Sequence, residues 1–397
     1  MPAIPSDNST PIDVNSPTSL FATIYLAVIG AAVFIVQPGF IQGLVELYGF
    51  SEQQAGYIAS AEVWGIALTT VVMALGGHNF SWQKILRASI ALFVTGNLIS
   101  LFTSEILSFG SIRFIVGLGA GGLISLSFTI IGLTRLADRN FGYLIMGVLT
   151  YGALGLWVLP TAFNVVGMQG VILSFALFGA TGWACLRHMP DSGEEHLQVE
   201  EDAVDLGGDF RLLAILAMFT YFFAQGVIWA YLFLIGLNGG VGEQGVANGL
   251  MLSQFLGIAG AFVAAMAGRK FGRIVPLAVG IVGGALVLVF LFGTFTALVY
   301  TLTVCVYNFA WNMSHPFLLG GMASFDRHGR VVVYAVAAQM LGLAIGPAFA
   351  AFLLSEGDYS RVIYAGIGLF ILSYLLILVP LLAHHRQITH PAPSVRA

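Results

Sequence analysis

Long apolar runs recur along the whole of this 397-residue chain. A helix needs about 20 apolar residues to span a bilayer, and we count twelve runs that approach or exceed this length. Backbone groups in lipid must pair within their own segment, so each run predicts a membrane-spanning helix. The alternating pattern of barrel strands does not occur. The runs are Leu20–Leu44, Gly56–Leu75, Ile85–Leu101, Ile106–Leu133, Phe141–Phe163, Val171–Leu186, Leu212–Leu237, Val246–Ala267, Ile274–Gly293, Phe295–Leu319, Val331–Leu354 and Val362–Leu382.

Charged residues are scarce, which excludes several classes of protein. Only 9% of the residues are charged and 58% are hydrophobic, whereas soluble domains carry roughly 25% charged residues. A soluble enzyme, a disordered chain and a nucleic-acid binder are therefore excluded. The two cysteines, Cys185 and Cys305, lie inside apolar runs and indicate neither a disulfide framework nor a zinc site. We expect no metal and no cofactor.

The runs form two sets of six, separated by a polar linker. The linker, His188 to Asp209, holds eight of the nineteen acidic residues. We interpret it as a solvated tether between two halves, with a regulatory docking site as the alternative. The expected organisation is a cytoplasmic tail, a bundle, an acidic cytoplasmic linker, a second bundle and a second cytoplasmic tail, at residues 1–19, 20–187, 188–210, 211–383 and 384–397.

Basic residues indicate how the chain is oriented in the membrane. If the N-terminus is cytoplasmic, thirteen of the fifteen Lys and Arg residues fall on cytoplasmic loops or on the C-terminal tail. Arg361 then lies outside and Arg113 lies within a span. This asymmetry predicts an even number of spans with both termini inside. We expect a multi-pass protein of the bacterial inner (plasma) membrane.

Two short segments of the first half recur in the second half. The segment Ala137–Gly142 after the fourth run resembles Phe325–Arg330 after the tenth, and Gly77–Phe80 resembles Gly268–Phe271. The two offsets are 188 and 191 residues. Echoes at nearly one offset predict a duplicated six-helix unit, and duplicated halves with a site between them are typical of transporters.

Two motifs resemble those of the major facilitator superfamily. The loop Gly268–Arg273 is similar to its signature G-x-x-x-D-R-x-G-R, with Arg269 in the place of the usual Asp. The segment Arg113–Gly121 is similar to its R-x-x-x-G-x-G-A pattern, whose arginine is associated with proton coupling in that family. The resemblance covers nearly the whole chain. It implies an all-α membrane protein of twelve transmembrane helices in two pseudo-symmetric six-helix bundles, acting as a monomer.

The antiporter signature of that family, G-x8-G-x3-G-P, is partly present in the fifth run. Gly155 and Pro160 fit it, whereas Met146 and Leu159 replace glycines. The eleventh run has a better tail in Gly342–Pro347. The resemblance therefore favours compact drug/H+ antiporters, and implies a secondary active transporter that performs proton-coupled efflux of a small organic solute. The alternative is proton-coupled uptake of a small metabolite, such as an aromatic or organic acid.

Only two of the charged residues, Glu62 and Arg113, lie well inside the apolar runs. An intramembrane charge costs at least ~2.5–3.5 kcal/mol on insertion scales and marks a functional site. Our hypothesis is that Glu62 gains and loses the coupled proton, while Arg113 either tunes this carboxylate or competes with the proton for it. A static buried ion pair and the binding of a charged substrate remain alternatives. Glu46 is expected at a solvated outer mouth, with a proton or cation access point as the alternative.

The second half carries neutral polar residues in its seventh and tenth runs. Four of them recur at i, i+3, i+4 and i+7, and so share one helical face. Two Asn and one His would be unfavourable against lipid, so this face should line the interior. We predict a substrate cavity, with hydrogen bonding between helices as the alternative. His315 is also a candidate second proton site. The candidate substrate-binding residues are Gln225, Trp229, Tyr307, Asn308, Trp311, Asn312 and His315.

The remaining function classes can be weighed from motifs. No Walker motif is present, so ATP is not the direct energy source. An intramembrane enzyme would need a nucleophile with its base or a metal cluster, and none is visible, so we predict no enzyme. A receptor-like protein that binds a solute without moving it is a third possibility. The expected partners are a small-molecule substrate, protons and the lipid bilayer, with no nucleic acid.

Overall fold

The computed structural model describes residues 12–76, 81–192, 203–267, 270, 272–327, 330–355 and 357–389. Over these ranges the chain is helical, and the one β-bridge, between Ser355 and Asp358, stands alone. The elements of the first half are α1 (Pro17–Ile35), α2 (Gln37–Tyr48), α3 (Glu52–Gly76), α4 (Trp82–Ser100), α5 (Ile106–Gly132), α6 (Ala137–Thr181) and η2 (Gly182–His188). Those of the second half are α7 (Gly208–Asn238), α8 (Glu243–Ala267), α9 (Ile274–Leu277), η3 (Ala278–Val282), α10 (Gly283–Val287), η4 (Leu288–Leu291), α11 (Ala297–Ser324), α12 (Arg330–Leu353) and α13 (Ser360–Thr389).

Each predicted apolar run coincides with a helical segment, so the all-α membrane fold is confirmed. Within the described ranges, nine segments are long and apolar enough to cross a bilayer. One of them, α6 with η2, holds two predicted runs. It turns at Gly167, whose φ of 65° and ψ of −178° interrupt the helix. Glycine tolerates this conformation because it has no Cβ. The predicted runs at α4 and α11 are helical but fall outside the nine.

The first predicted run contains two helices rather than one. Val36, with φ −103° and ψ 12°, separates α1 from α2. Pro38 lies two residues further on, and a proline has no N–H to donate to the carbonyl four residues earlier. That carbonyl belongs to Phe34. At the break the Phe34 carbonyl accepts the Val36 N–H and lacks the donor that a continuous helix would supply from residue 38.

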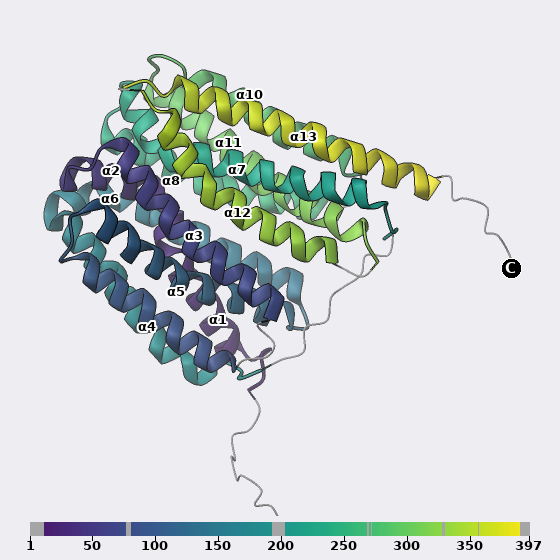
Figure 1. The fold of residues 1–397 in the computed structure, drawn as a ribbon, viewed down its shortest axis with the longest axis horizontal. Helices are drawn as coiled ribbons and strands as arrows, with labels where there is room; N and C mark the ends of the chain where they lie inside the picture. Colours follow the sequence, from purple (N-terminus) through teal and green to yellow (C-terminus); the bar gives the residue numbers. More distant parts are fainter. Residues whose placement is uncertain are drawn as a thin grey trace, which may run out of the picture.

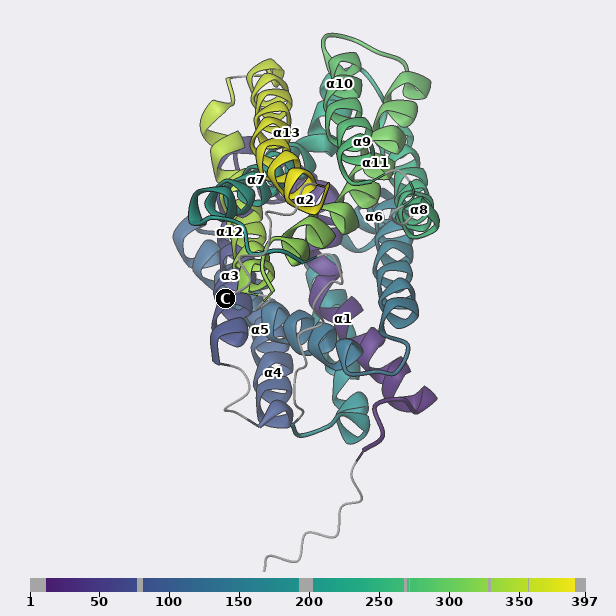
Figure 2. The same ribbon diagram turned by 90° about the vertical axis from the view of Figure 1, so that its right-hand side faces the viewer.

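The helices gather into two groups, α1–α6 and α7–α13; most of the first group lies in the lower part of both views and most of the second in the upper part (Figures 1 and 2), while α2 lies against α7. We call the side that carries the start of α1, the end of η2, the start of α7 and the end of α13 the linker side, and the opposite side the far side. The ends of the linker are anchored on the linker side. Trp82 N donates to Asp191 O at 2.8 Å, and Val204 N donates to Ser324 O at 3.0 Å.

Two helices exceed the bundle boundaries expected from the sequence. Helix α7 begins at Gly208 rather than at residue 211. Helix α13 continues to Thr389, past residue 383, because His384 is buried with its ring 5.7 Å from that of Phe325. Residues 193–202 of the acidic linker, the repeat segment Gly77–Phe80 and residues 268, 269 and 271 of the loop signature lie outside the described residues.

Candidate functional site: a buried ion pair and a cavity between the bundles

Glu62 on α3 and Arg113 on α5 form an ion pair inside the first bundle. Arg113 Nη2 lies 2.8 Å from Glu62 Oε1, and Arg113 Nε donates to Glu62 Oε2 at 3.0 Å. The two side chains are 5% and 0% exposed, respectively. Paired contacts of this kind between a guanidinium and a carboxylate are strong and directional. Glu62 and Arg113, the two charged residues that lie well inside the predicted membrane spans, are therefore in contact.

The Arg113 guanidinium has further partners within the same bundle. Its Nη1 donates to Asn97 Oδ1 at 2.8 Å, and Asn97 Nδ2 in turn donates to Phe93 O at 2.8 Å. The ring of Phe40 lies 5.2 Å from the guanidinium carbon, a cation–π contact. Asn97 and Phe40 were not among the predicted site residues. Asn97 is the lone amide of the predicted run Ile85–Leu101, and that isolation is the signal that could have indicated it.

Glycines hold the two helices of the ion pair close together. A Cβ on Gly117 of α5 would lie 2.0 Å from Glu62 O, and a Cβ on Gly65 of α3 would lie 2.2 Å from Phe114 O. Backbones that approach this closely require glycine at the crossing. The crossing thus fixes the separation of the two backbones beside the ion pair. The distance between Glu62 and Arg113 can then change only through movement of their side chains.

A cavity of about 170 Å³ lies between the two bundles. The first bundle contributes walls from α1, α3, α5 and α6, and the second contributes walls from α7, α8, α11 and α12. Neither Glu62 nor Arg113 lines this cavity, although Val63 and Ile66, on the same helix as Glu62, do. Among the described lining residues none is an acid, a lysine or an arginine.

The structure brings most of the predicted substrate residues to this cavity. Its lining includes Trp229 and all four residues of the stripe on α11, Asn308, Trp311, Asn312 and His315. Gln225 and Tyr307 do not line it. Instead Tyr307 Oη donates to Gln225 Oε1 in a closely packed region between α7 and α11. These two residues connect helices of the second bundle, which is the alternative interpretation given above.

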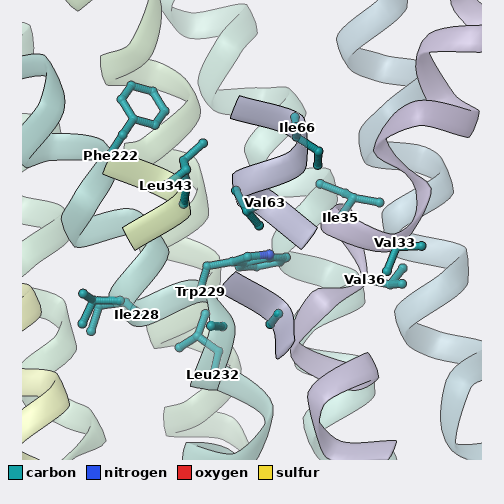
Figure 3. Close-up of a cluster of buried hydrophobic side chains, with 14 of the residues drawn as sticks. Val33, Ile35, Val36, Val63, Ile66, Phe222, Ile228, Trp229, Leu232 and Leu343 are labelled. Atoms are coloured by element: carbon teal, nitrogen blue, oxygen red, sulfur yellow. The ribbon is translucent and has the colours of Figure 1, made fainter. Parts of the chain in front are cut away.

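Two tryptophans of the second bundle lie side by side in the cavity wall. The rings of Trp229 and Trp311 lie 5.8 Å apart at 73°. Figure 3 shows the Trp229 indole projecting from α7 toward α1 and α3, close to Ile35, Val36 and Val63. Its Nε1 donates to Phe34 O at 3.3 Å. This acceptor is the carbonyl that Pro38 leaves without its helical donor.

Amide side chains form the polar part of the cavity wall. Asn312 Nδ2 donates to Asn308 Oδ1 at 2.8 Å, and Asn308 Nδ2 donates to Ser253 Oγ at 3.2 Å. His315 Nε2 lies 3.0 Å from Gln339 Oε1. Gln339 and a second glutamine, Gln254 of α8, line the cavity and were missed by the sequence analysis. Gln339 is the lone amide of its apolar run, and Gln254 shares its run with one other amide, Asn248; this scarcity of amides was the available signal.

The hydrogen bonds that join the bundles in the described part of the chain lie toward the far side. Tyr231 Oη donates to Glu52 O at 2.9 Å, and Ser60 Oγ donates to Ala344 O at 2.6 Å. A Cβ on Gly56 would lie 2.0 Å from Tyr231 Oη, so the bundles also pack tightly here. The far side is therefore closed, and the cavity extends from Trp229 toward the linker side.

Glu46 lies near the far end of α2 and is exposed. Gln42 Nε2 donates to its carboxylate. This placement fits the solvated mouth expected from the sequence. Among the described residues, no group of three or more His, Cys, Asp or Glu residues could hold a metal ion.

Comparisons with known proteins place this geometry in a family. No curated protein matches the chain. The solved D-xylose-proton symporter is similar to it with a TM-score of 0.73 at 16% identity, over 91% of this chain and 96% of that one. The inward-open xylose transporter XylE from E. coli has a TM-score of 0.69 at 16% identity, over 93% of this chain and 95% of that one. The POT family transporter PepTSo has a TM-score of 0.74 at 12% identity, over 94% of this chain and 99% of that one. Identities this low show the shared fold alone. The family model of the Major Facilitator Superfamily matches residues 22–324, and the chain belongs to this superfamily of membrane transporters.

Proposed function

We propose that this chain is a secondary active transporter that exports a small organic solute in exchange for protons by alternating access. The observation that carries the proposal is the cavity between the two bundles, which both halves line and which is closed at one end. Rocking of one half against the other would expose such a site to each side in turn. This arrangement needs no reacting groups in the cavity, in keeping with a transporter rather than an enzyme.

The direction in which the cavity extends supports an inward-facing state. With both termini and the linker placed in the cytoplasm, as the basic residues indicate, the far side is the outer side. The contacts of Tyr231 with Glu52 and of Ser60 with Ala344 then close the outer side. The site is placed to collect solute from the cytoplasm or the inner leaflet, as export from the inner membrane of a bacterium would require.

Glu62 is the group proposed to carry the coupled proton. Its carboxylate is buried beside the cavity wall and is paired with Arg113. Protonation of Glu62 would break the ion pair and leave Arg113 with Asn97 and the Phe40 ring. The helix that carries Glu62 also carries Ser60 and Val63, which contact the second bundle and the cavity. Glu62 would thus bind its proton close to the contacts between the bundles that must break and re-form during alternating access.

Uptake of an organic acid is less well supported by the geometry. In that alternative Arg113 would bind the carboxylate of the solute. The guanidinium is instead buried, bonded to Glu62 and Asn97, and does not line the cavity. A solute carboxylate would have to displace Glu62 from inside the bundle. An uncharged or weakly charged, largely apolar solute suits the observed walls better.

The proposal is tested with the purified chain in proteoliposomes. A panel of amphiphilic and metabolite-like solutes is screened by thermal shift, and those that bind are assayed for flux with a pH gradient imposed in either direction. Antiport predicts that a solute moves against the direction of proton flow. Symport of the same solute would contradict the proposed direction. Binding of several solutes with no flux under any gradient would contradict transport.

A further inference from the structure

Gln254 of α8 is a buried amide at the cavity wall without a partner. The residue is 0% exposed, and it lines the cavity between the bundles. Both its Oε1 and its Nε2 lack a hydrogen-bond partner. A buried polar group is normally paired, and each one left unpaired calls for an explanation. Here the amide carries one acceptor and one donor group that the protein does not use.

The neighbours of Gln254 are already engaged with one another. Ser253 Oγ donates to Leu250 O at 2.7 Å and accepts from Asn308 Nδ2 at 3.2 Å. Asn312 Nδ2 is turned to Asn308. The other cavity glutamine, Gln339, is bonded to His315. Gln254 therefore differs from the other amides of this wall, each of which has a partner.

The unpaired amide lies where the two bundles meet. Its Oε1 would be 3.4 Å from a Cβ on Gly152 of α6, in the first bundle. The same Cβ would lie 2.6 Å from Ile35 Cγ1 of α1, so the glycine is required by the packing of α6 on α1 and brings this part of the first bundle into contact with the amide. A molecule bonded to Gln254 would consequently touch both halves of the protein. A solute bound at this position would gain or lose contacts when the two halves move relative to each other.

We infer that Gln254 is the specificity-determining residue of the cavity and that its ligand is an uncharged, largely apolar small molecule bearing a lactam or carboxamide group. Such a group offers one N–H and one C=O side by side, and pairs with both free groups of the glutamine. The rest of the lining is aromatic and aliphatic, with amides and one His but no described Asp, Glu, Lys or Arg. An anion or a polyol would leave its own groups unpaired there.

The inference is tested by binding, with the chain in nanodiscs. The probes are 2-quinolone, a neutral lactam; 2-methoxyquinoline, which lacks the N–H; and quinoline-2-carboxylate, an anion. Trp229 and Trp311 line the cavity, so quenching of tryptophan fluorescence reports occupancy. We expect the wild type to bind 2-quinolone about tenfold more tightly than either other probe. Gln254→Leu should abolish this preference.

Matched variants keep the test decisive. Gln244→Leu changes an exposed glutamine at the start of the same helix and should retain the preference. The unliganded Gln254→Leu protein should melt no lower than the wild type, because it loses an amide that was unpaired. Gln254→Met serves the same purpose if the leucine variant does not fold. Retained lactam preference in both Gln254 variants, or no lactam preference in the wild type, overturns the inference.

The inference rests on the proposed function in one respect, since it treats the cavity as the solute site. Its failure is distinguishable from failure of that function. Flux of some other solute without lactam preference upholds transport and overturns the role of Gln254. Gln254-dependent lactam binding without flux of any solute upholds the binding site and overturns transport.

Discussion

The indole Nε1 of Trp229 donates to the carbonyl oxygen of Phe34 at 3.3 Å, across the boundary between the two bundles. Residue 38 is a proline, so this carbonyl lacks the donor that a continuous helix would supply. The break at Val36 therefore affects how the two bundles contact each other. It creates an acceptor in the first bundle that a residue of the second bundle uses when the far side is closed.

We predict that Pro38→Ala weakens closure of the far side. An alanine restores the N–H that competes with Trp229 for Phe34 O. One hydrogen bond contributes about 1 kcal/mol, which corresponds to about a fivefold change in the ratio of closed to open molecules. Distances between spin labels at Glu46→Cys and Glu243→Cys, exposed near the far ends of α2 and α8, measure this ratio after Cys185 and Cys305 are replaced by Ser.

Trp229→Phe should shift the label distances in the same direction, because it removes the donor and keeps the ring. Pro380→Ala, in the interior of α13, is the matched proline control and should leave the distances at wild-type values. Unchanged distances in both Pro38→Ala and Trp229→Phe would show that this bond does not hold the far side closed.

Gly117→Ala should separate α3 from α5 and disturb the ion pair. The new Cβ would lie 2.0 Å from Glu62 O, a backbone atom that cannot move alone. Overpacking of this kind costs about 1–3 kcal/mol, so the melting temperature in nanodiscs should fall. Gly142→Ala, where a Cβ meets nothing within 4 Å, is the control. Equal melting temperatures for the two variants would contradict the close crossing.

Trp311→Ala should weaken binding of any solute that the panel identifies by about tenfold or more. Its ring lies in the cavity wall beside Trp229, and stacking on an aromatic ring is lost with it. The control is Tyr307→Phe, one turn earlier, which removes only the hydroxyl bonded to Gln225 outside the cavity. Titration by tryptophan-independent calorimetry compares the two. Similar affinity in both variants would remove Trp311 from the site.

The sequence predicted those parts of the structure that depend on composition over long stretches. Twelve apolar runs gave the helices because lipid requires paired backbones. The contact of Glu62 with Arg113 could be anticipated because intramembrane charges are rare. The spacing of Asn308, Trp311, Asn312 and His315 placed these side chains on one face, and they all reach the cavity.

Other features depend on packing between segments far apart in the chain, and the sequence does not show them. Gln225 and Tyr307 satisfy each other and so turn away from the cavity, although their residue types resemble those that line it. Gln254 belongs to no spacing pattern, and its free amide appears only when its neighbours are seen bonded to one another. Helix α13 extends past its apolar run because His384 packs on Phe325.

The roles of Glu62 and Arg113 can be separated from simple stability. Glu62→Gln leaves a buried guanidinium without its counter-charge, which typically costs about 3–5 kcal/mol. The double variant Glu62→Gln/Arg113→Gln removes both charges and should recover part of this loss of stability. Any difference in transport between these proteins is then measured at matched amounts of folded protein, judged by size-exclusion chromatography.

The most direct test of proton-coupled transport is solute flux in proteoliposomes, measured for the wild type and for Glu62→Gln in two modes. In the first mode a pH gradient drives net flux, and in the second mode unlabelled solute on one side drives counterflow without a gradient. Coupling through Glu62 predicts that the variant loses gradient-driven flux and keeps counterflow. Gradient-driven flux at the wild-type rate in Glu62→Gln would contradict the account and leave the ion pair with Arg113 as a structural feature.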